Sequence, residues 1–321
     1  MKKAGRGMAE LCGAVIGAGF ASGRELAAFF ARFGPWSWAG VAVSAALMGI
    51  LCLEVMRRPG IAGMPEAWQG RFMGRVWQGL FGCLLAVTGG AMLAGGGEVA
   101  ALMLPLHGSR EIGLIIMLAA GWMLARGESA WLAAVSRGLI LCLIAMIAAG
   151  LWLPPQPGVV LQDGNWEAVL QGLCYGGFNM ALAAPVAAMT GSRMNCREQT
   201  RCAAGFAAMI TLLLACGNGV LLRHAALLGE SLPFVQLLAG LGPMGYGLCG
   251  AALYLAALTT LTACLQGLHA IRPAHMGVMA AGIVLLSMAG LEGIVGRVYP
   301  VLGGGCVLLL IAAQAVKRTK T

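Results

Sequence analysis

Long apolar runs, separated by short polar gaps, dominate the pattern of this chain. Most are close to the ~20 residues that cross a bilayer as a helix. Ten can be marked, at residues 8–33, 36–56, 77–104, 112–125, 130–153, 166–190, 199–222, 243–267, 276–291 and 296–316. A transmembrane barrel would instead show alternating strands of about ten residues. The pattern therefore predicts an all-α polytopic membrane protein with ten transmembrane helices.

The runs recur in order, because runs two to five match runs seven to ten at an offset of roughly 165 residues. The two shortest runs, 112–125 and 276–291, correspond. So do the two long connections, 58–76 and 223–242, each with proline and a predicted short surface helix. Five crossings per half would insert the second half upside down, as in the inverted repeats of secondary transporters. Chance spacing is the alternative. The predicted repeats, within one membrane domain, are residues 1–153 and 154–321.

Composition agrees with a membrane protein. Of the 321 residues 60% are apolar and only 10% charged, against about 25% charged in soluble domains. That balance excludes a soluble globule and a disordered chain. The net charge is +9. The basic residues lie in the loops between apolar runs, where they set the orientation of the protein in the membrane. We therefore expect no nucleic-acid partner.

Basic residues are distributed unequally between the two predicted sides. With the N-terminus inside, the outer segments carry four, Arg32, Arg110, Arg223 and Arg297. The inner segments carry fifteen, Lys2, Lys3, Arg6, Arg57, Arg58, Arg71, Arg75, Arg126, Arg193, Arg197, Arg201, Arg272, Lys317, Arg318 and Lys320. This bias predicts both termini in the cytoplasm and an even number of crossings.

Enzyme chemistry has little support in the sequence. The 11 cysteines include no Cys-x-x-Cys pair, and the 4 histidines include no helical i, i+4 pair. We expect no disulfide framework, zinc site or prosthetic group, and no enzyme, since no nucleophile or metal constellation is visible. The basic start could also begin a signal peptide, but Arg24 and Glu25 within the first run favour a transmembrane helix.

The first run of each half contains a stretch that is unfavourable in a helix. Residues 13–23 read GAVIGAGFASG, and residues 175–179 read YGGFN, followed by Pro185. Glycine costs a helix about 1 kcal/mol relative to alanine. We therefore predict that helices 1 and 6 are broken near mid-membrane, where freed N–H groups would take a carboxylate and freed carbonyls a cation. The alternative for the glycines is close helix packing, since they also form small-xxx-small motifs.

Residues 13–34, GAVIGAGFASGRELAAFFARFG, resemble the first helix of the YkvI family of bacterial membrane proteins. The strings YGGFNMALAAPV and ALTTLTA, in runs six and eight, fit the same family. The family is related to the amino acid–polyamine–organocation superfamily, and the resemblance therefore implies a LeuT-like five-plus-five inverted repeat. It also implies a bundle of helices 1, 2, 6 and 7 that moves against a scaffold of helices 3, 4, 8 and 9. It does not supply a substrate.

The resemblance also implies a sodium site. In sodium-coupled carriers of this fold, adjacent hydroxyls on helix 8 and carbonyls at the break of helix 1 hold the ion. Thr259 and Thr260 match the hydroxyls, and Gly13 and Ile16 would supply carbonyls, with Ala256 as a fifth donor. The alternative for the threonines is a hydrogen bond to a carbonyl of their own helix.

The substrate is expected between the two breaks, on the backbone of residues 17–19 and on the YGGFN stretch. The predicted substrate-binding residues are Gly17, Ala18, Gly19, Thr88, Tyr175, Gly177, Phe178 and Asn179. Glu25 and Glu98 are candidates for coupling, because an ionisable group inside the membrane is costly and marks function by default. The alternatives are an ion pair with a nearby arginine for Glu25 and an outer vestibule position for Glu98.

Together these features predict a secondary active transporter of the bacterial inner membrane, working by alternating access. We expect sodium-coupled symport of a small amino acid or related zwitterion, with a proton as the second choice of coupling ion. The lipid bilayer is its surroundings and a small molecule its partner. The alternatives are a proton-coupled carrier of another solute, a channel, and a non-transporting sensor or scaffold component.

Overall fold

A computed structural model of the protein describes residues 2–57, 72–104, 106–127, 130–156, 158, 166–271 and 276–318. These residues are helical, and no strand occurs among them. The helices are α1 (Lys2–Val15), α2 (Ala18–Ala21), α3 (Arg24–Phe29), η1 (Ala31–Trp36), α4 (Ser37–Arg57), α6 (Phe72–Met103), α7 (Ser109–Ala125), α8 (Ala130–Trp152), α9 (Glu167–Gly191), α10 (Cys196–Arg223), η3 (Ala225–Leu227), α11 (Pro233–Ala239), α12 (Gly242–Ile271), α13 (Met276–Ser287), α14 (Gly290–Gly293), η5 (Ile294–Val298) and α15 (Tyr299–Arg318).

Six stretches of helix within the described residues are long and apolar enough to cross a membrane. They are Ala31–Arg57, Gly74–Met103, Glu167–Gly191, Cys196–Arg223, Gly242–Ile271 and Gly290–Leu309. Two shorter apolar helices, Gly138–Trp152 and Gly277–Ser287, accompany them. The architecture is that of an all-α multi-pass membrane protein, as the apolar runs predict.

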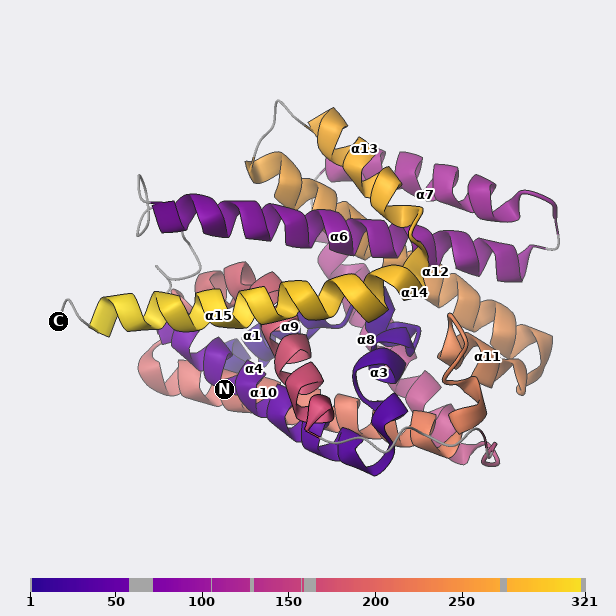
Figure 1. Ribbon diagram of the computed structural model, residues 1–321, viewed down its shortest axis with the longest axis horizontal. Coiled ribbons are helices and arrows are strands. Elements are labelled where there is room, and N and C mark those ends of the chain that lie inside the picture. Colours follow the sequence, from indigo (N-terminus) through magenta and orange to yellow (C-terminus); the bar gives the residue numbers. More distant parts are fainter. Residues whose placement is uncertain are drawn as a thin grey trace.

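The helices form two packing groups (Figure 1). In one group α4 packs on α9 and α10, and α1 packs on α9 and α10. In the other group α6 packs on α7, α12 and α13, and α12 also packs on α7. The short helix α2 packs on α6 and α12 of the second group, helix α8 contacts both groups, and α15 packs on α9. The first helix therefore meets the second group mainly through α2, just after its interruption.

Local sequence signals explain several helix ends. Asn195 caps α10, because its side chain accepts from the Glu198 N–H (3.0 Å) while the Glu198 carboxylate accepts from the Asn195 N–H (3.2 Å). Pro233 opens α11, where its missing N–H costs nothing. Gly23, with φ of 81°, occupies the left-handed turn between α2 and α3.

The predicted break in helix 6 is wrong, because α9 runs without interruption from Glu167 to Gly191. Its glycines instead allow close helix contacts. A side chain on Gly172 would overlap the backbone of Gly40 in α4, and one on Gly177 would overlap the Gly303 carbonyl in α15. Pro185 lies inside the helix without ending it. In α9 the packing alternative for a glycine-rich stretch is therefore correct.

The two long connections differ in what can be said of them. The surface helix predicted in 58–76 falls largely on residues 58–71, which lie outside the described residues. The helix predicted in 223–242 exists as α11, but it is not a surface helix. Its apolar side chains are buried, and it packs on α12 and α8. Phe234 is pressed against Gly23, and its N–H donates to the Ser22 carbonyl (3.0 Å).

Candidate functional site

The first helix is interrupted where the glycine-rich string predicts it. Helix α1 ends at Val15, and α2 begins two residues later. The Gly17 N–H turns back to the Val15 carbonyl (3.0 Å) instead of continuing the helical ladder. Within the described chain, the carbonyls of Gly13 and Ile16 receive no backbone N–H, and the N–H groups of residues 18–20 find no carbonyl. These are the unpaired backbone groups that any helix end leaves.

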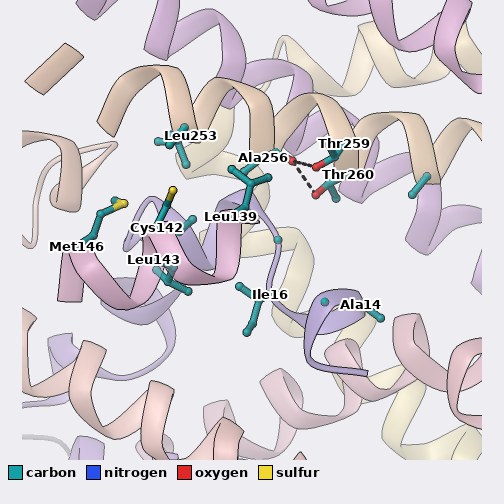
Figure 2. A pocket seen from close by; sticks show the side chains of 15 residues that line it. Ala14, Ile16, Leu139, Cys142, Leu143, Met146, Leu253, Ala256, Thr259 and Thr260 are labelled. Carbon is teal, nitrogen blue, oxygen red and sulfur yellow. Dashed lines mark hydrogen bonds between the residues drawn. The ribbon is translucent and has the colours of Figure 1, made fainter. Parts of the chain in front are cut away.

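A cavity of about 120 Å³ lies beside this interruption, between α1, α8 and α12 (Figure 2). All five predicted sodium ligands line it, Gly13, Ile16, Ala256, Thr259 and Thr260. A side chain on Gly17 would lie 3.6 Å from the Thr260 hydroxyl, so the break and α12 are in close contact. The volume exceeds the ~30 Å³ of one water molecule, so an ion with part of its hydration shell fits.

The two threonines of this cavity donate their hydroxyl protons to one acceptor. Thr259 Oγ1 and Thr260 Oγ1 donate to the Ala256 carbonyl, at 2.9 Å and 3.0 Å (Figure 2). This is the own-helix bond named above as the alternative to a sodium site. It does not prevent cation binding, because a hydroxyl that donates keeps lone pairs that accept. The Ala256 carbonyl already accepts twice and is the weakest of the five expected ligands.

The opposite wall of the cavity comes from α8 and was not predicted. Leu139, Cys142, Leu143 and Met146 line it (Figure 2). One wall therefore offers oxygen atoms and the other offers hydrocarbon and sulfur, which are poor ligands for a hard cation. An ion here would be held from the α1 and α12 side only.

The predicted substrate residues do not share one cavity. Gly17 lines the cavity just described, whereas Ala18 and Gly19 line a small one between α2, α6 and α12. On α9, Gly177 packs against α15 and lines none of the cavities described in this section. Phe178 stacks on Tyr299 with ring centroids 4.0 Å apart, and it therefore packs instead of facing open space.

Glu25 lies at the centre of a buried polar cluster. Its side chain is 6% exposed, and a side chain on Gly19 would overlap its carboxyl. The hydroxyl of Tyr175 lies beside this carboxyl and beside the Asn179 side chain, without a hydrogen bond of good geometry. Asn179 Nδ2 donates to the Tyr175 carbonyl (3.0 Å). The sequence places Tyr175 and Asn179 near the site, and the structure brings both to Glu25.

Tyr299, the first residue of α15, belongs to the same cluster. It is fully buried, its hydroxyl lies beside that of Thr88, and it interacts electrostatically with Glu25. It was not predicted from the sequence. A tyrosine at the start of an apolar run carries no signal of function, and only the tertiary packing of α15 on α9 reveals its position.

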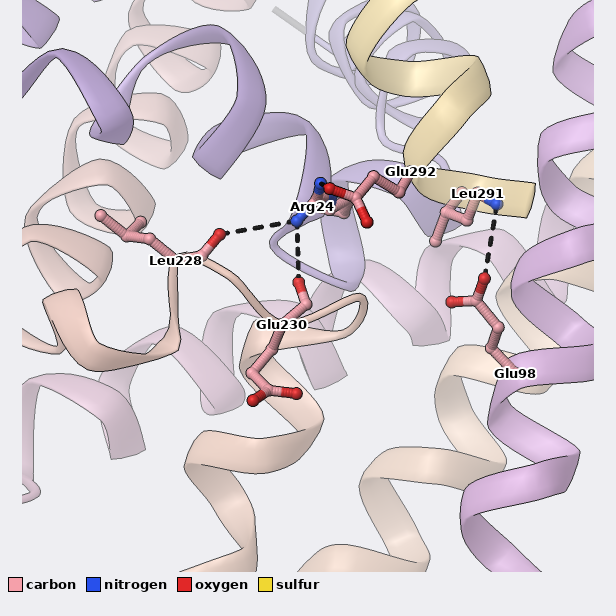
Figure 3. A network of polar contacts seen from close by, with 6 residues as sticks. All are labelled: Arg24, Glu98, Leu228, Glu230, Leu291 and Glu292. Carbon is pink, nitrogen blue, oxygen red and sulfur yellow. Dashed lines mark hydrogen bonds and ion pairs between the residues drawn. The ribbon is translucent and has the colours of Figure 1, made fainter. Parts of the chain in front are cut away.

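On the predicted outer side, Arg24 ties three segments together (Figure 3). Its guanidinium pairs with Glu292 of α14 at 2.6 Å. It also donates to the carbonyls of Glu230 (3.0 Å) and Leu228 (3.5 Å), in the segment before α11. Glu25 therefore does not pair with its neighbour Arg24, which is engaged elsewhere. Glu98 accepts from the Leu291 N–H (3.4 Å) and lines a cavity together with Arg24 and Glu292.

Two larger cavities lie on either side of the cluster. The first, named the outer cavity because it lies on the predicted outer side, is about 640 Å³ and polar, and it is lined by Arg24, Arg32, Glu98, Glu292 and Arg297 among others. The inner one, about 520 Å³, lies between α1, α6, α9 and α12, near the predicted cytoplasmic ends of α6 and α12. It is mostly apolar, with Trp77 and Pro185 in its wall and Thr88 and Thr260 as hydroxyl groups.

No group of three or more His, Cys, Asp or Glu side chains within the described ranges has the geometry of a metal site. The ligands expected around Thr259 and Thr260 are hydroxyl and carbonyl oxygens, which do not belong to these side-chain types. In comparisons with known proteins, no family model and no curated protein matches the chain.

Proposed function

We propose that this protein is a secondary active transporter that works by alternating access, with sodium as coupling ion and a small amino acid or related zwitterion as substrate. The observation that carries the proposal is the interruption of the first helix opposite Thr259 and Thr260, across a cavity that all five expected ligands line. Interrupted backbone at membrane depth is tolerated only where it is buried in protein or lines a water-filled cavity.

Helix packing supports the five-plus-five repeat of the proposal, and with it ten crossings. In the proposed repeat α1, α4, α6 and α7 correspond to α9, α10, α12 and α13. Replacing each helix by its counterpart converts the contact of α4 with α9 into the contact of α10 with α1, and both contacts are present. The contact of α6 with α13 becomes that of α12 with α7, which is also present. The contacts of α4 with α10 and of α6 with α12 map onto themselves. Such paired contacts are expected for an inverted repeat and therefore support it over a chance spacing of the apolar runs.

The two packing groups agree with the proposed bundle and scaffold, which would move against each other. The proposed bundle of α1, α4, α9 and α10 and the proposed scaffold of α6, α7, α12 and α13 are the groups seen in Figure 1. A YkvI-type protein with a LeuT-like fold would rock one group against the other. The sodium cavity lies between α1 and α12, one from each group, so an ion there would bias their relative position.

A cavity lies on each predicted side of the membrane, as a carrier with alternating access would need. On the predicted outer side Arg24 joins α3 to α14 and to the segment before α11, beside the cavity of about 640 Å³. The inner cavity reaches Thr88 and Thr260 from the predicted cytoplasmic side. A substrate carboxylate would meet the free N–H groups of residues 18–20, with Asn179 as a further donor.

The uninterrupted α9 favours an alternative of another class, a non-transporting sensor or scaffold component of the membrane. Such a component would need no response to sodium or to a transportable solute. A proton-coupled carrier of another solute is the alternative favoured by the buried Glu25.

Thermal unfolding of the purified protein in sodium chloride against choline chloride, crossed with a panel of amino acids, tests the proposal. A ligand at ~100 times its Kd stabilises the native state by about 2.7 kcal/mol. We expect a sodium-specific rise of Tm that one class of amino acid increases further. Thr260→Ala should abolish the sodium response. Thr262→Ala is the matched control, since Thr262 donates to the Leu258 carbonyl (2.7 Å) and does not line the cavity.

No response to sodium and to any amino acid would overturn the sodium-coupled proposal. An unchanged sodium response in Thr260→Ala would remove this site even if transport is found. Sodium-driven uptake into proteoliposomes then separates a carrier from a protein that merely binds the ion.

A further inference from the structure

The carboxyl of Glu25 is buried among groups that cannot neutralise a negative charge. Helices α9 and α15 each present a phenol to it, Tyr175 and Tyr299. The α10 face that packs on α3 presents Gly217 against Leu26. Phe29 and Phe30 enclose the Tyr175 ring, at centroid distances of 5.1 and 5.0 Å. An isolated carboxylate in such surroundings carries a large desolvation cost.

The nearby cations are directed elsewhere. Arg24 pairs with Glu292, and both Arg24 and Arg297 line the outer cavity. Arg32 lies over the Phe33 ring (4.6 Å) and pairs with Glu167 (3.7 Å). Among the residues the structure describes, no basic side chain is paired with Glu25. The carboxyl is therefore either protonated or waiting for a cationic ligand.

The space around the Glu25 carboxyl distinguishes a bound proton from a bound cationic ligand. None of the four cavities described above is lined by Glu25, and its carboxyl is packed against the backbone of Gly19. A substrate ammonium needs a cavity next to the carboxylate, whereas a proton needs none.

Two buried hydroxyls extend from the surroundings of this carboxyl to the inner cavity. The Tyr299 hydroxyl interacts electrostatically with Glu25 and lies beside the Thr88 hydroxyl, and Thr88 lines the inner cavity. The hydroxyls of Tyr299 and Thr88 are both buried and both lack a hydrogen-bond partner in this conformation. A hydroxyl can donate and accept at once, so two in sequence can pass a proton by rotation.

We propose that Glu25 is a proton-binding site, neutral in this conformation, and that Tyr299 and Thr88 connect it to the inner cavity. The proton leaves the Glu25 carboxyl, passes the two hydroxyls and enters the solvent of that cavity, and the carboxylate is left ionised. The role of this proton in coupling rests on the transporter function proposed above, whereas the binding of a proton to Glu25 does not.

Infrared difference spectroscopy on the purified protein in lipid tests this directly, because only a protonated carboxyl has the carboxylic-acid C=O band. At neutral pH the wild type should show a band that Glu25→Gln lacks. Glu111→Gln is the matched control, since Glu111 is exposed at the start of α7, and it should keep the band. After a jump to alkaline pH, Tyr299→Phe and Thr88→Val should lose the band about tenfold more slowly. Tyr246→Phe, at the predicted outer end of α12, should match the wild type.

Three results would overturn the proposal. Identical bands in the wild type and in Glu25→Gln would mean that Glu25 is ionised. Loss of the band on adding methylammonium at constant pH would mean that the carboxylate holds an ammonium group. Unchanged rates in both Tyr299→Phe and Thr88→Val would remove the route. If the band behaves as expected and no solute is transported, the transporter function fails and the proton site stands.

Discussion

Single glycines have two opposite uses in this protein. Gly17 lies at an interruption, where the absence of a side chain brings the backbone within reach of Thr260. Gly177 lies inside a continuous helix, where it lets α15 approach. Both occur in glycine-rich strings, so the local sequence does not distinguish them. The difference lies in the neighbour, which is a cavity for the first and a helix backbone for the second.

The packing role of Gly177 predicts the effect of a single methyl group. Gly177→Ala would overlap Val307 and the Gly303 carbonyl, and overpacking of this kind costs about 1–3 kcal/mol. We expect a lower Tm of the detergent-purified protein. Gly304→Ala is the control, because its methyl would meet only the Cys174 sulfur, at 3.8 Å. Equal melting of wild type and Gly177→Ala would contradict the close contact of α9 with α15.

At the residue scale the interruption near Gly17 was predictable from the sequence, because a glycine-rich string is a local departure from plain hydrocarbon. The threonine pair on α12 was predicted from the family resemblance, and its role as a sodium site stays a prediction. Tyr299 and Glu292 were not, since their importance depends on which helix lies opposite them. A single sequence contains no information about such a partner.

At the scale of elements, α11 is held by the first helix as well as by its apolar packing on α12 and α8. The Phe234 N–H donates to the Ser22 carbonyl, and Arg24 donates to two carbonyls just before the helix. The short segment 225–239 therefore depends on the position of α3. Movement of α3 would release it, and this connects the predicted outer side to the interruption of the first helix.

Removing the Arg24 charge should lower the local stability of segment 225–239. Hydrogen bonds to charged groups contribute about 1.5–3 kcal/mol, so in Arg24→Gln amide hydrogen exchange in 225–239 should accelerate about tenfold or more. The swap Arg24→Glu with Glu292→Arg should restore part of the protection, because the ion pair is re-formed. Arg193→Gln, on an exposed turn after α9, should leave the exchange unchanged. No acceleration in Arg24→Gln would show that α11 is held by its apolar contacts alone.

In helix α9 the Ala181 carbonyl receives no helical N–H, because residue 185 is a proline. A proline inside a helix costs about 3 kcal/mol relative to alanine. Pro185→Ala should therefore raise the free energy of unfolding by about 1–3 kcal/mol, measured by chemical denaturation. Pro154→Ala, in the exposed segment after α8, should have little effect. If Pro185→Ala is neutral or destabilising, the proline is already accommodated by its surroundings.

Element positions were more predictable than element continuity. Apolar runs of about 20 residues locate helices because hydrocarbon excludes every other local structure except a closed barrel. Whether a run is interrupted depends on a small balance between glycine cost and tertiary contact. For the first run the balance favours interruption at residues 16–17, and for the sixth it favours a straight helix packed on α4 and α15.

At the scale of the whole molecule, the cavity lined by Thr259 and Thr260 lies where the two packing groups meet, with α8 as its third wall. An ion there would draw α1 toward α12, and its departure would let them separate. The buried Glu25 lies on the other side of the interruption, in α3. The interruption therefore separates two candidate cation sites, and any movement of the first helix would affect both.

That arrangement requires a particular path through the membrane, which is itself testable. Six described stretches are long and apolar enough to cross, and the proposed ten crossings add α1–α3, α7, α8 and α13. An epitope inserted after His107, in the exposed turn before α7, should be reached by antibody on intact cells. One inserted after Ser192, and tags at both termini, should be reached only after permeabilisation. A tag at the C-terminus that is accessible from outside would make the number of crossings odd. Two halves of five crossings give an even number. An odd number would therefore contradict the inverted repeat and the two-group mechanism that depends on it.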